Sequence, residues 1–348
     1  MKIAWSVSHT GLLEMLASLF PEHEFTALGV IREDMRNALS GQEEFRPNMK
    51  IGPVDLNRVN ISEFDLLIEL AEANGYNNDW RHIASMWKIP RIYYITNPGP
   101  YLGEFKKLER FIGRRRAYGM SLKARGPNGY KLYSPSPYDY WKKCGKYPIV
   151  FSSRILREEW KLDGRVIHNT APKEWERAEY VGDIPKMLFG KNGYYTWAKP
   201  TGPEQIKFFS ELEKTFGDKL EIHDSSVDGL SEKDWIEKCT HYRCWFDHDF
   251  GSSGRALCQG LVKAMAIGMP VFVWKTRFSE AEGLVNPFSV HDNMSFLASV
   301  VNSLLDSVDE ARIFSKSTKG YYKRKLSNAV IRPQWEEVME EAVRLHGG

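Results

Sequence analysis

The sequence predicts an α/β protein made of two successive Rossmann-like domains, on three observations. The chain has 348 residues, and domains usually span about 100–200 residues. Short apolar runs alternate with helical stretches, the pattern of parallel strands joined by crossover helices. The alternation stops once, at a charged stretch that holds prolines, and then restarts. We therefore expect a first domain over 1–170, a linker over 171–184, a second domain over 185–330 and a final helix over 331–348.

The first domain is expected to open with a strand at Lys2–Val7 and a helix at Leu12–Leu19. Further strands are expected at 24–30, 64–70, 91–96, 148–151 and 165–168, and further helices at 32–40, 80–87, 104–118 and 153–160. Ligands of parallel sheets bind beyond the carboxyl ends of the strands. The loops that follow strands are therefore where functional residues should lie.

The second domain repeats this order. Strands are expected at 186–189, 220–223, 242–246 and 271–274, and helices at 203–216, 231–238, 257–268, 279–283, 294–305, 308–325 and 333–345. Ser231 suits the N-cap of its helix. Gly268 suits the left-handed position that ends a helix.

The segment 251–273 is the strongest motif: a loop of small residues, a helix, a glycine stop and a buried strand. Glycine and serine allow close backbone approach to a ligand, and free N–H groups at a helix start attract an anion. The donor-site candidates of this segment are Ser252, Ser253, Gly254, Arg255 and Lys263. Arg255 and Lys263 are two turns apart, on nearly the same helix face. Alone, the segment fits a nucleotide site and an ordinary strand-loop-helix equally well.

Other loops also carry candidate groups. Glu69, Glu72 and His9 could act as general bases, and Asn97 could orient a hydroxyl. For His9 a structural role in the loop agrees with the sequence at least as well, and carboxylates placed like Glu69 and Glu72 are more often solvated or cap a loop. Gly11 stands at a helix start, and Lys191 and Lys199 follow the first strand of the second domain, where cations suit a diphosphate. Asp247, His248 and Asp249 could bind a divalent metal, but three consecutive residues cannot all face one ion on a regular element. No metal site is therefore predicted, and a divalent metal could take part but is not required.

Charge is unevenly distributed. The formal net charge is +3, but residues 106–146 hold twelve Lys or Arg against two acids, with seven interleaved aromatic residues. Such a stretch can hold phosphates and stack on bases, although a solvated basic face is the other interpretation. The candidates for contact with nucleic acid are Arg114, Arg115, Arg116, Lys123 and Arg125.

The sequence shows neither of the usual membrane signals. No apolar run approaches the ~20 residues of a membrane span, and polar residues interrupt the N-terminal apolar stretch too early for a signal peptide. The four cysteines have no metal-binding spacing. We expect a cytoplasmic protein without a membrane partner, and a monomer.

The run Gly254–Phe272 resembles the donor-site helix of glycosyltransferases with the GT-B fold, in which a glycine-rich loop precedes Glu-Ala-Met-Ala-x-Gly-x-Pro-Val. Val166–Asn169 is similar to the Val-Ile-x-Asn that closes the first domain of that family. The resemblance implies two Rossmann-like domains facing a cleft, with the C-terminal helix packing back toward the first domain. It also implies a nucleotide-sugar donor, a UDP-sugar first of all, whose diphosphate would lie against 252–255 and Lys191.

Residues 64–97 are in addition similar to the bacteriophage glucosyltransferases that modify 5-hydroxymethylcytosine in DNA, and the size and the final helix with Trp335 agree. This likeness implies a double-stranded DNA acceptor and the cytoplasm of an infected host. A polysaccharide, a lipid-linked sugar or a protein remains an alternative acceptor. A non-catalytic nucleic-acid-binding protein on the same scaffold is the alternative function, and an epimerase based on Glu280, Glu282 and His291 is less favoured.

Two departures from the families matter. Lys263 stands where GT-B enzymes carry a glutamate that holds the ribose, which leaves the ribose contact open. Asn97 stands where the phage enzymes carry an aspartate base. Either another residue is the base, or the reaction retains configuration and needs none.

Overall fold

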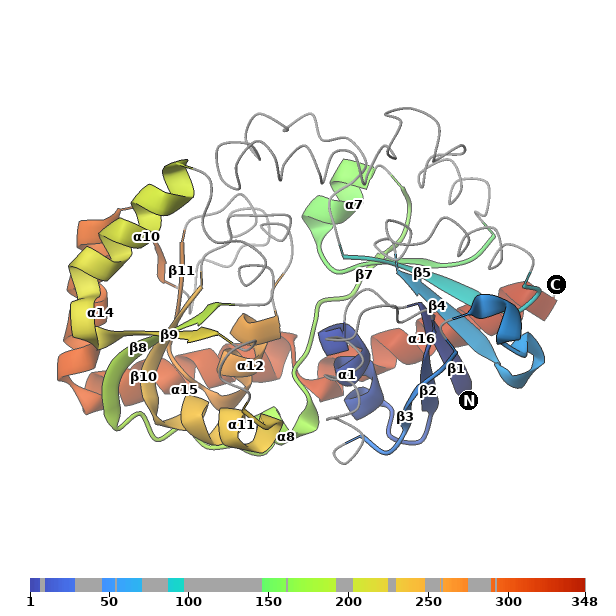
Figure 1. Ribbon diagram of the computed structural model, residues 1–348, viewed down its shortest axis with the longest axis horizontal. Helices are drawn as coiled ribbons and strands as arrows, with labels where there is room; N and C mark the ends of the chain where they lie inside the picture. Colours follow the sequence, from blue (N-terminus) through green and yellow to red (C-terminus); the bar gives the residue numbers. More distant parts are fainter. Residues whose placement is uncertain are drawn as a thin grey trace. The chain divides into compact units, whose positions relative to one another are not determined.

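The computed structural model describes residues 1–6, 10–28, 46–53, 55–70, 87–96, 146–160, 162–191, 203–224, 230–247, 257, 259–274, 289–291 and 293–347. These residues form two compact α/β units (Figure 1). The first unit contains the described residues up to Pro172 together with 328–347, and the second contains the described residues from Lys173 to Ser327. Among the described residues, the chain passes between the units at 172–173 and again at 327–328.

The first unit contains a seven-stranded sheet in the order β3-β2-β1-β4-β5-β6-β7. Its strands are β1 (Lys2–Ser6), β2 (Glu24–Leu28), β3 (Met49–Ile51), β4 (Leu66–Leu70), β5 (Arg91–Ile95), β6 (Ile149–Phe151) and β7 (Arg165–Val166). All neighbours pair in parallel; Ile3 of β1, for example, pairs with Phe25 and with Leu66. The all-parallel order explains why β1, β4 and β5 are nearly continuous apolar runs.

Helices cover one face of this sheet. Leu12 and Leu16 of α1 (Thr10–Leu19) share a buried core with Ile331, Trp335 and Val338 of α16 (Asn328–Gly347). The other face packs against Trp87, Ile89 and the segment from Val59 to Phe64, which includes the 3-10 turn η2 (Ile61–Glu63) and follows the 3-10 turn η1 (Leu56–Arg58). Helix α7 (Arg154–Trp160) joins β6 to β7.

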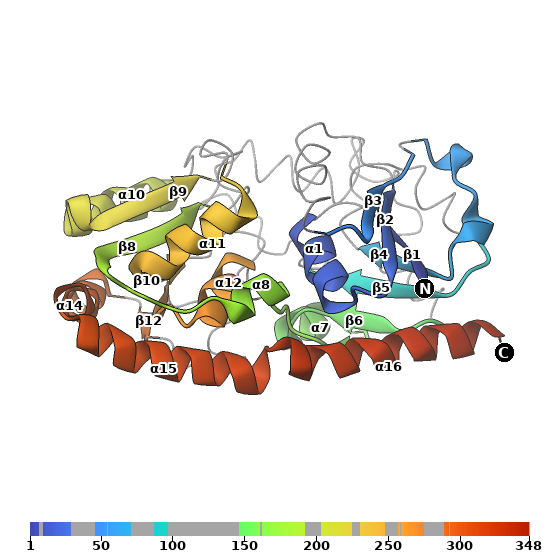
Figure 2. The ribbon, with the colours of Figure 1, turned by 90° about the horizontal axis from the view of Figure 1, so that it is seen from below.

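The C-terminal helix packs against the first sheet, as predicted, and Figure 2 shows it running along that unit. It begins at Asn328 rather than at 333, with Pro333 inside it. The physical reason is the apolar face of α16, which extends to the fully buried Ile331, before the proline.

The second unit contains a five-stranded sheet in the order β12-β11-β10-β8-β9. The strands are β8 (Ile184–Lys191), β9 (Leu220–Asp224), β10 (Tyr242–Asp247), β11 (Val271–Trp274) and β12 (Ser289–His291), again all parallel. The helices are α8 (Lys173–Arg177), α10 (Pro203–Phe216), α11 (Glu232–His241), α12 (Gln259–Ile267), α14 (Met294–Asp306) and α15 (Val308–Lys325), with the 3-10 turn η4 (Gly217–Lys219) after α10.

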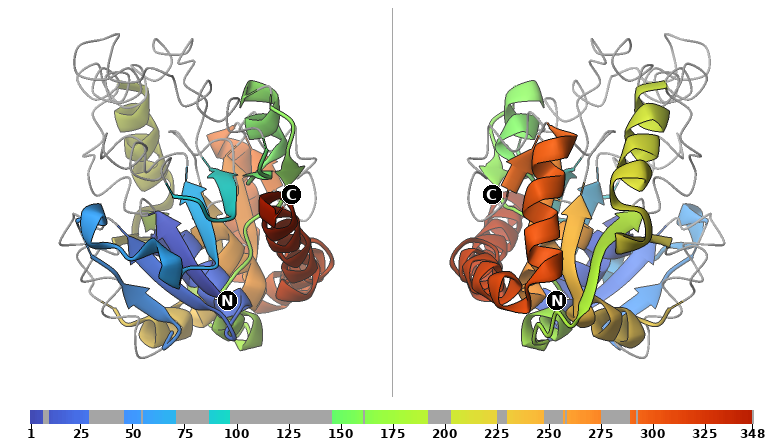
Figure 3. Two further views of the ribbon diagram at one scale, coloured as in Figure 1. Left: turned by 90° about the vertical axis from the view of Figure 1, so that its right-hand side faces the viewer. Right: turned by 90° about the vertical axis from the view of Figure 1, so that its left-hand side faces the viewer.

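Two groups of helices cover the two faces of this sheet. On one face, Phe208 and Leu212 of α10 and Leu297 and Val301 of α14 share a core with Phe246 of β10; Figure 3 shows α10 and α14 along the strands. On the other face, α11 and α12 pack on β10 and β11. Both sheets are therefore parallel and covered on both faces, which confirms the predicted fold class.

The structure adds elements that the sequence reading did not expect. Strands β3 and β12 are only three residues long, too short for a recognisable apolar run. Helix α8 lies within the stretch expected as a linker, and its Trp175 is buried. The helices expected at 32–40, 104–118 and 279–283, and that at 80–87 except for Trp87, lie outside the described residues. No helix in the described part of the chain is both long enough and apolar enough to cross a membrane.

Candidate functional site

Helix α12 packs closely against strand β10 in the second unit. A Cβ atom built on Gly260 would lie 2.8 Å from Cζ2 of Trp245, closer than real contacts allow. Ala264 and Ala266 of the same helix are also buried. The small residues in the motif therefore let α12 approach the sheet directly after the segment 251–256.

The end of α12 has the expected glycine stop. Gly268 has φ +92°, its N–H donates to the carbonyl of Met265, and Met269 N–H donates to the carbonyl of Ala264. This pair of bonds is a Schellman motif, and it confirms the prediction for Gly268. The N-cap predicted for α11 is also present, because Ser231 Oγ accepts from Asp234 N–H at 3.2 Å.

Lys263 has a carboxylate partner within its own unit. Its Nζ atom lies 3.3 Å from Oε1 of Glu232 on α11 and 5.2 Å from the centre of the Trp175 ring on α8. The indole N–H of Trp175 donates to the same oxygen at 2.8 Å. The three side chains form a mostly buried cluster, here called the α8–α11–α12 cluster, which balances the Lys263 charge.

The remaining predicted site residues are placed as follows. Lys191 is the last residue of β8, and Gly11 is the second residue of α1, at the carboxyl end of β1. Both positions are where a ligand of a parallel sheet would be met. Outside the described residues lie His9, Glu72, Asn97, Arg114, Arg115, Arg116, Lys123, Arg125, Lys199, Ser252, Ser253, Gly254 and Arg255.

Glu69 lies in β4 and is fully buried. Its Oε2 atom is 4.0 Å from Nη1 of Arg91, whose other terminal nitrogen donates to the carbonyl of Trp87. The guanidinium also lies over the ring of Tyr147, 5.7 Å from its centre. A neighbouring cation offsets part of the cost of burying a carboxylate, so the geometry gives Glu69 a structural partner.

Hydrogen bonds join the carboxyl ends of the first sheet's strands. Ser6 at the end of β1 accepts from Leu70 N–H at 2.8 Å. Tyr94 of β5 donates its hydroxyl proton to Oδ1 of Asn169 at 2.8 Å. These bonds connect the end of β1 to the end of β4, and β5 to the segment that follows β7.

The sequence reading assigned no role to His168. It lies two residues beyond β7, half-buried, and its Nδ1 atom is 3.1 Å from the backbone carbonyl of Ser152, which follows β6. The signal that could have found it was a histidine at the carboxyl end of the strand expected at 165–168. A histidine at such a position is a candidate for proton transfer.

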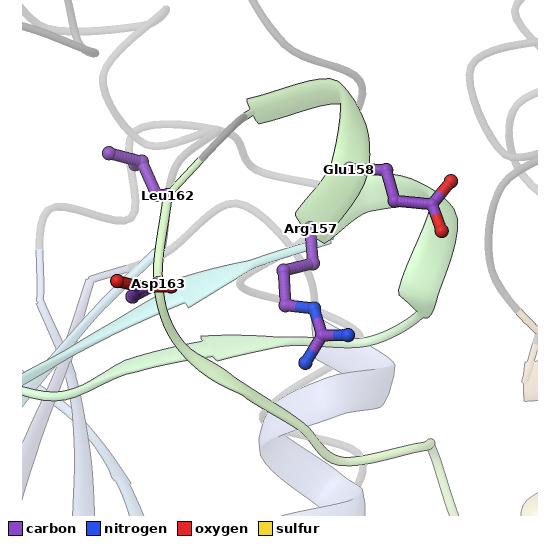
Figure 4. Close-up of a pocket in the computed structure, with 4 residues that line it drawn as sticks. All are labelled: Arg157, Glu158, Leu162 and Asp163. Carbon is purple, nitrogen blue, oxygen red and sulfur yellow. The ribbon is translucent and has the colours of Figure 1, made fainter.

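A hollow of about 490 Å³ lies beside α7, lined by Arg157, Glu158, Leu162 and Asp163 (Figure 4). The side chains of Leu162 and Glu158 point in opposite directions in that view. Because its polar groups do not converge, the hollow is a surface feature of the loop between α7 and β7. Within the described residues, no three His, Cys, Asp or Glu side chains gather as a metal site would need.

No protein-family model matches the chain, and neither does any curated protein. Solved structures do. Sucrose-phosphate synthase from Thermosynechococcus elongatus aligns over 98% of this chain and 98% of its own, with TM-score 0.58 and 11% identity. AviGT4, a glycosyltransferase involved in avilamycin A biosynthesis, aligns over 99% of this chain and 98% of its own, with TM-score 0.52 and 13% identity.

The β-glucosyltransferase of phage T4, solved with its substrate UDP-glucose, aligns over 99% of both chains with TM-score 0.49 and 11% identity. That score is too low for us to draw anything from the alignment about this chain's acceptor. The two stronger likenesses cover nearly the whole chain and agree with the two parallel sheets. The chain therefore has the two-domain GT-B fold.

Proposed function

We propose that the protein is a glycosyltransferase that moves a sugar from a nucleotide-sugar donor to an acceptor hydroxyl. The observation that carries this proposal is the β10–α12–β11 unit. Its sequence resembles the GT-B donor segment, and its helix has the close packing at Gly260 and the glycine stop at Gly268 described above. A helix that begins after a Gly/Ser loop at the carboxyl edge of a sheet suits a diphosphate.

The donor site would include Ser252, Ser253, Gly254 and Arg255, with Lys191 at the end of β8 and Lys199 as further cations. Gly11 at the start of α1 is the first unit's candidate for the same ligand. A UDP-sugar is the donor we favour. Catalysis would consist mainly of positioning and of stabilising negative charge on the leaving diphosphate.

For the acceptor, we favour a 5-hydroxymethyl pyrimidine in double-stranded DNA. The support is the basic, aromatic composition of residues 106–146 and the sequence likeness of 64–97 to the phage enzymes. A polysaccharide, a lipid-linked sugar or a protein is the alternative that the same fold would serve. The DNA proposal requires binding that weakens steeply with salt.

The test is a thermal-shift screen against nucleotide-sugars, followed by mass spectrometry of hydroxymethylated duplex DNA incubated with the best donor. We expect a shift with UDP-glucose or a related donor and a mass gain of one sugar on the DNA. Reversing the charges of Arg114, Arg115 and Arg116 should abolish DNA binding while the donor-induced shift remains. DNA binding without any donor-induced shift would instead identify a non-catalytic nucleic-acid-binding protein.

A further inference from the structure

We infer that Lys319 is a positioning residue that anchors the end of helix α12 and thereby fixes the start of that helix for the donor; this inference rests on the glycosyl transfer proposed above. Lys319 is a half-buried residue of α15. Its Nζ atom donates to the backbone carbonyl of Ala266, in the last turn of α12. It also donates to the carbonyl of Glu176 in α8 at 3.0 Å and to that of Ala178, just after α8, at 3.4 Å. An ammonium group has three N–H donors, so this one side chain joins α15 to two other helices of the second unit.

The bond to Ala266 adds to the cap at the end of α12. The last four carbonyls of a helix have no partner within the helix. In α12, two of these carbonyls accept from the backbone through the Schellman motif at Gly268, and the carbonyl of Ala266 accepts from Lys319. A lysine at this place also interacts favourably with the negative end of the helix dipole. Lys319 therefore supplies the side-chain part of an anchor whose backbone part is the glycine stop.

Helix α15 packs directly on that glycine stop. A Cβ atom built on Gly268 would lie 3.1 Å from Oγ of Ser315 and 3.3 Å from Cβ of Lys319. The stem of Lys319 thus lies against the end of α12, which itself packs on both α8 and α15 (Figure 2). Burial lowers the pKa of Lys319 from its usual value, because the ammonium form has a desolvation cost that its three carbonyl acceptors offset in part. Lys319 is therefore a built contact between helices and not a solvated surface charge.

The anchor acts on the start of α12 because the helix is short and stiff. It has nine residues, which makes it about 13 Å long. Near its start Gly260 packs against the ring of Trp245, and in its middle Lys263 joins the α8–α11–α12 cluster. A shift at its end would be carried to its start, which the proposed donor segment 252–255 precedes in the chain. A misplacement of about 1 Å is enough to cost about 10²-fold in rate.

Four variants separate the anchor from its surroundings. Lys319→Met keeps the apolar stem and removes the ammonium group, whereas Lys319→Arg keeps a cation with several donors. Tyr322→Phe removes the hydroxyl that donates to Oε1 of Glu176 at 2.9 Å, a bond that joins α15 to α8 without involving α12. Lys316→Met is the matched charge control, because it removes an exposed cation one turn earlier in α15.

The assay measures UDP-glucose affinity by calorimetry, kcat and KM for UDP release with water as acceptor, and hydrogen exchange of the α12 amides. In Lys319→Met we expect weaker UDP-glucose binding, a loss of up to about 10²-fold in kcat/KM and faster exchange at the end of α12. Lys319→Arg should recover most of this loss, because it donates to the same carbonyls. Tyr322→Phe and Lys316→Met should bind and turn over UDP-glucose as the unaltered chain does.

A merely structural lysine would give a different result. If Lys319→Met unfolds at lower urea but, when folded, binds and turns over UDP-glucose like the unaltered chain, the positioning role is overturned. Equal losses in Lys319→Arg and Lys319→Met would overturn it as well, because the cation would then not matter. Should Lys319→Met fail to fold, Lys319→Gln keeps two amide donors, and unchanged UDP-glucose affinity in that variant would likewise overturn the inference.

Failure of the transferase proposal is recognisable separately. No binding and no turnover of UDP-glucose by the unaltered chain would overturn that proposal, and the positioning role with it. Faster exchange at the end of α12 in Lys319→Met, with unchanged exchange in Lys316→Met, would in that case still show that Lys319 anchors the helix.

Discussion

The ammonium group of Lys263 lies 3.3 Å from Oε1 of Glu232, and Trp175 donates a hydrogen bond to the same carboxylate oxygen. Only 15% of the lysine side chain and 5% of the glutamate side chain are exposed. A mostly buried pair of this kind is costly to break from one side, because the remaining charge keeps its desolvation penalty without its partner. Lys263 therefore has a structural role within the second unit.

We predict that Lys263→Met lowers the free energy of unfolding by about 3 kcal/mol, measured by urea titration. Affinity for UDP-glucose, measured by calorimetry on the folded variant, should change little because the charge of Lys263 is already balanced. Lys263→Arg is the matched control, since it keeps the charge. A loss of affinity of about tenfold, or 1.4 kcal/mol, without a loss of stability would make Lys263 a donor ligand.

Glu69 and Arg91 allow a second test. Removing either charge alone leaves the other buried, so we expect Glu69→Gln and Arg91→Met each to cost about 3–5 kcal/mol of stability. The double variant should cost much less than the sum of the two, because neither charge is left alone. Urea titrations of the four proteins give the coupling energy. Additive losses would show that the 4.0 Å pair contributes little.

The two parallel sheets could be predicted because their strands are apolar on both faces and alternate with helices of recognisable period. The helix ends at Ser231 and Gly268 could also be predicted, because in each case a single residue type satisfies the geometry of the helix end. The short strands β3 and β12 could not be predicted from the sequence. A strand of three residues has too little apolar pattern, and the pairing of these strands depends on neighbours that are distant in sequence.

The candidate site could be predicted only in part, because some of its contacts join residues that are distant in sequence. Lys263 was expected to face a ligand because its spacing from Arg255 places both on one helix face. In the structure Lys263 also contacts Glu232, which is 31 residues away on another helix, and no local pattern reports such a contact. The contact of His168 with the carbonyl of Ser152 was overlooked because the two residues are 16 positions apart.

The buried cysteines of the second unit should be unreactive. Burial raises the pKa of the Cys239 thiol well above its usual value, and burial likewise raises the pKa of Cys244. Only the thiolate reacts with alkylating agents. At mildly alkaline pH, iodoacetamide should therefore leave both unmodified in the folded protein and label both in urea, as shown by peptide mass mapping. Labelling of either thiol at the unfolded rate under native conditions would contradict this.

Gly260 gives the sharpest test of the packing beneath the proposed donor site. A Cβ atom at this position would lie 2.8 Å from Cζ2 and 3.3 Å from Cη2 of Trp245, a large buried ring that has little room to move. Gly260→Ala should therefore cost about 1–3 kcal/mol of stability. It should also weaken UDP-glucose binding, because the start of α12 must shift away from β10.

The matched control is Gly320→Ala in the middle of α15. There the new methyl group would meet only the flexible end of Arg324, at 3.3 Å. Since alanine is the better helix former, this variant should gain about 0.5–1 kcal/mol and bind UDP-glucose unchanged. Urea titration gives the free energy of unfolding of both variants, and calorimetry gives their affinity for UDP-glucose. Equal changes in stability would mean that the contact with Trp245 does not limit the position of α12. The small residues of the motif would then be needed for the ligand alone.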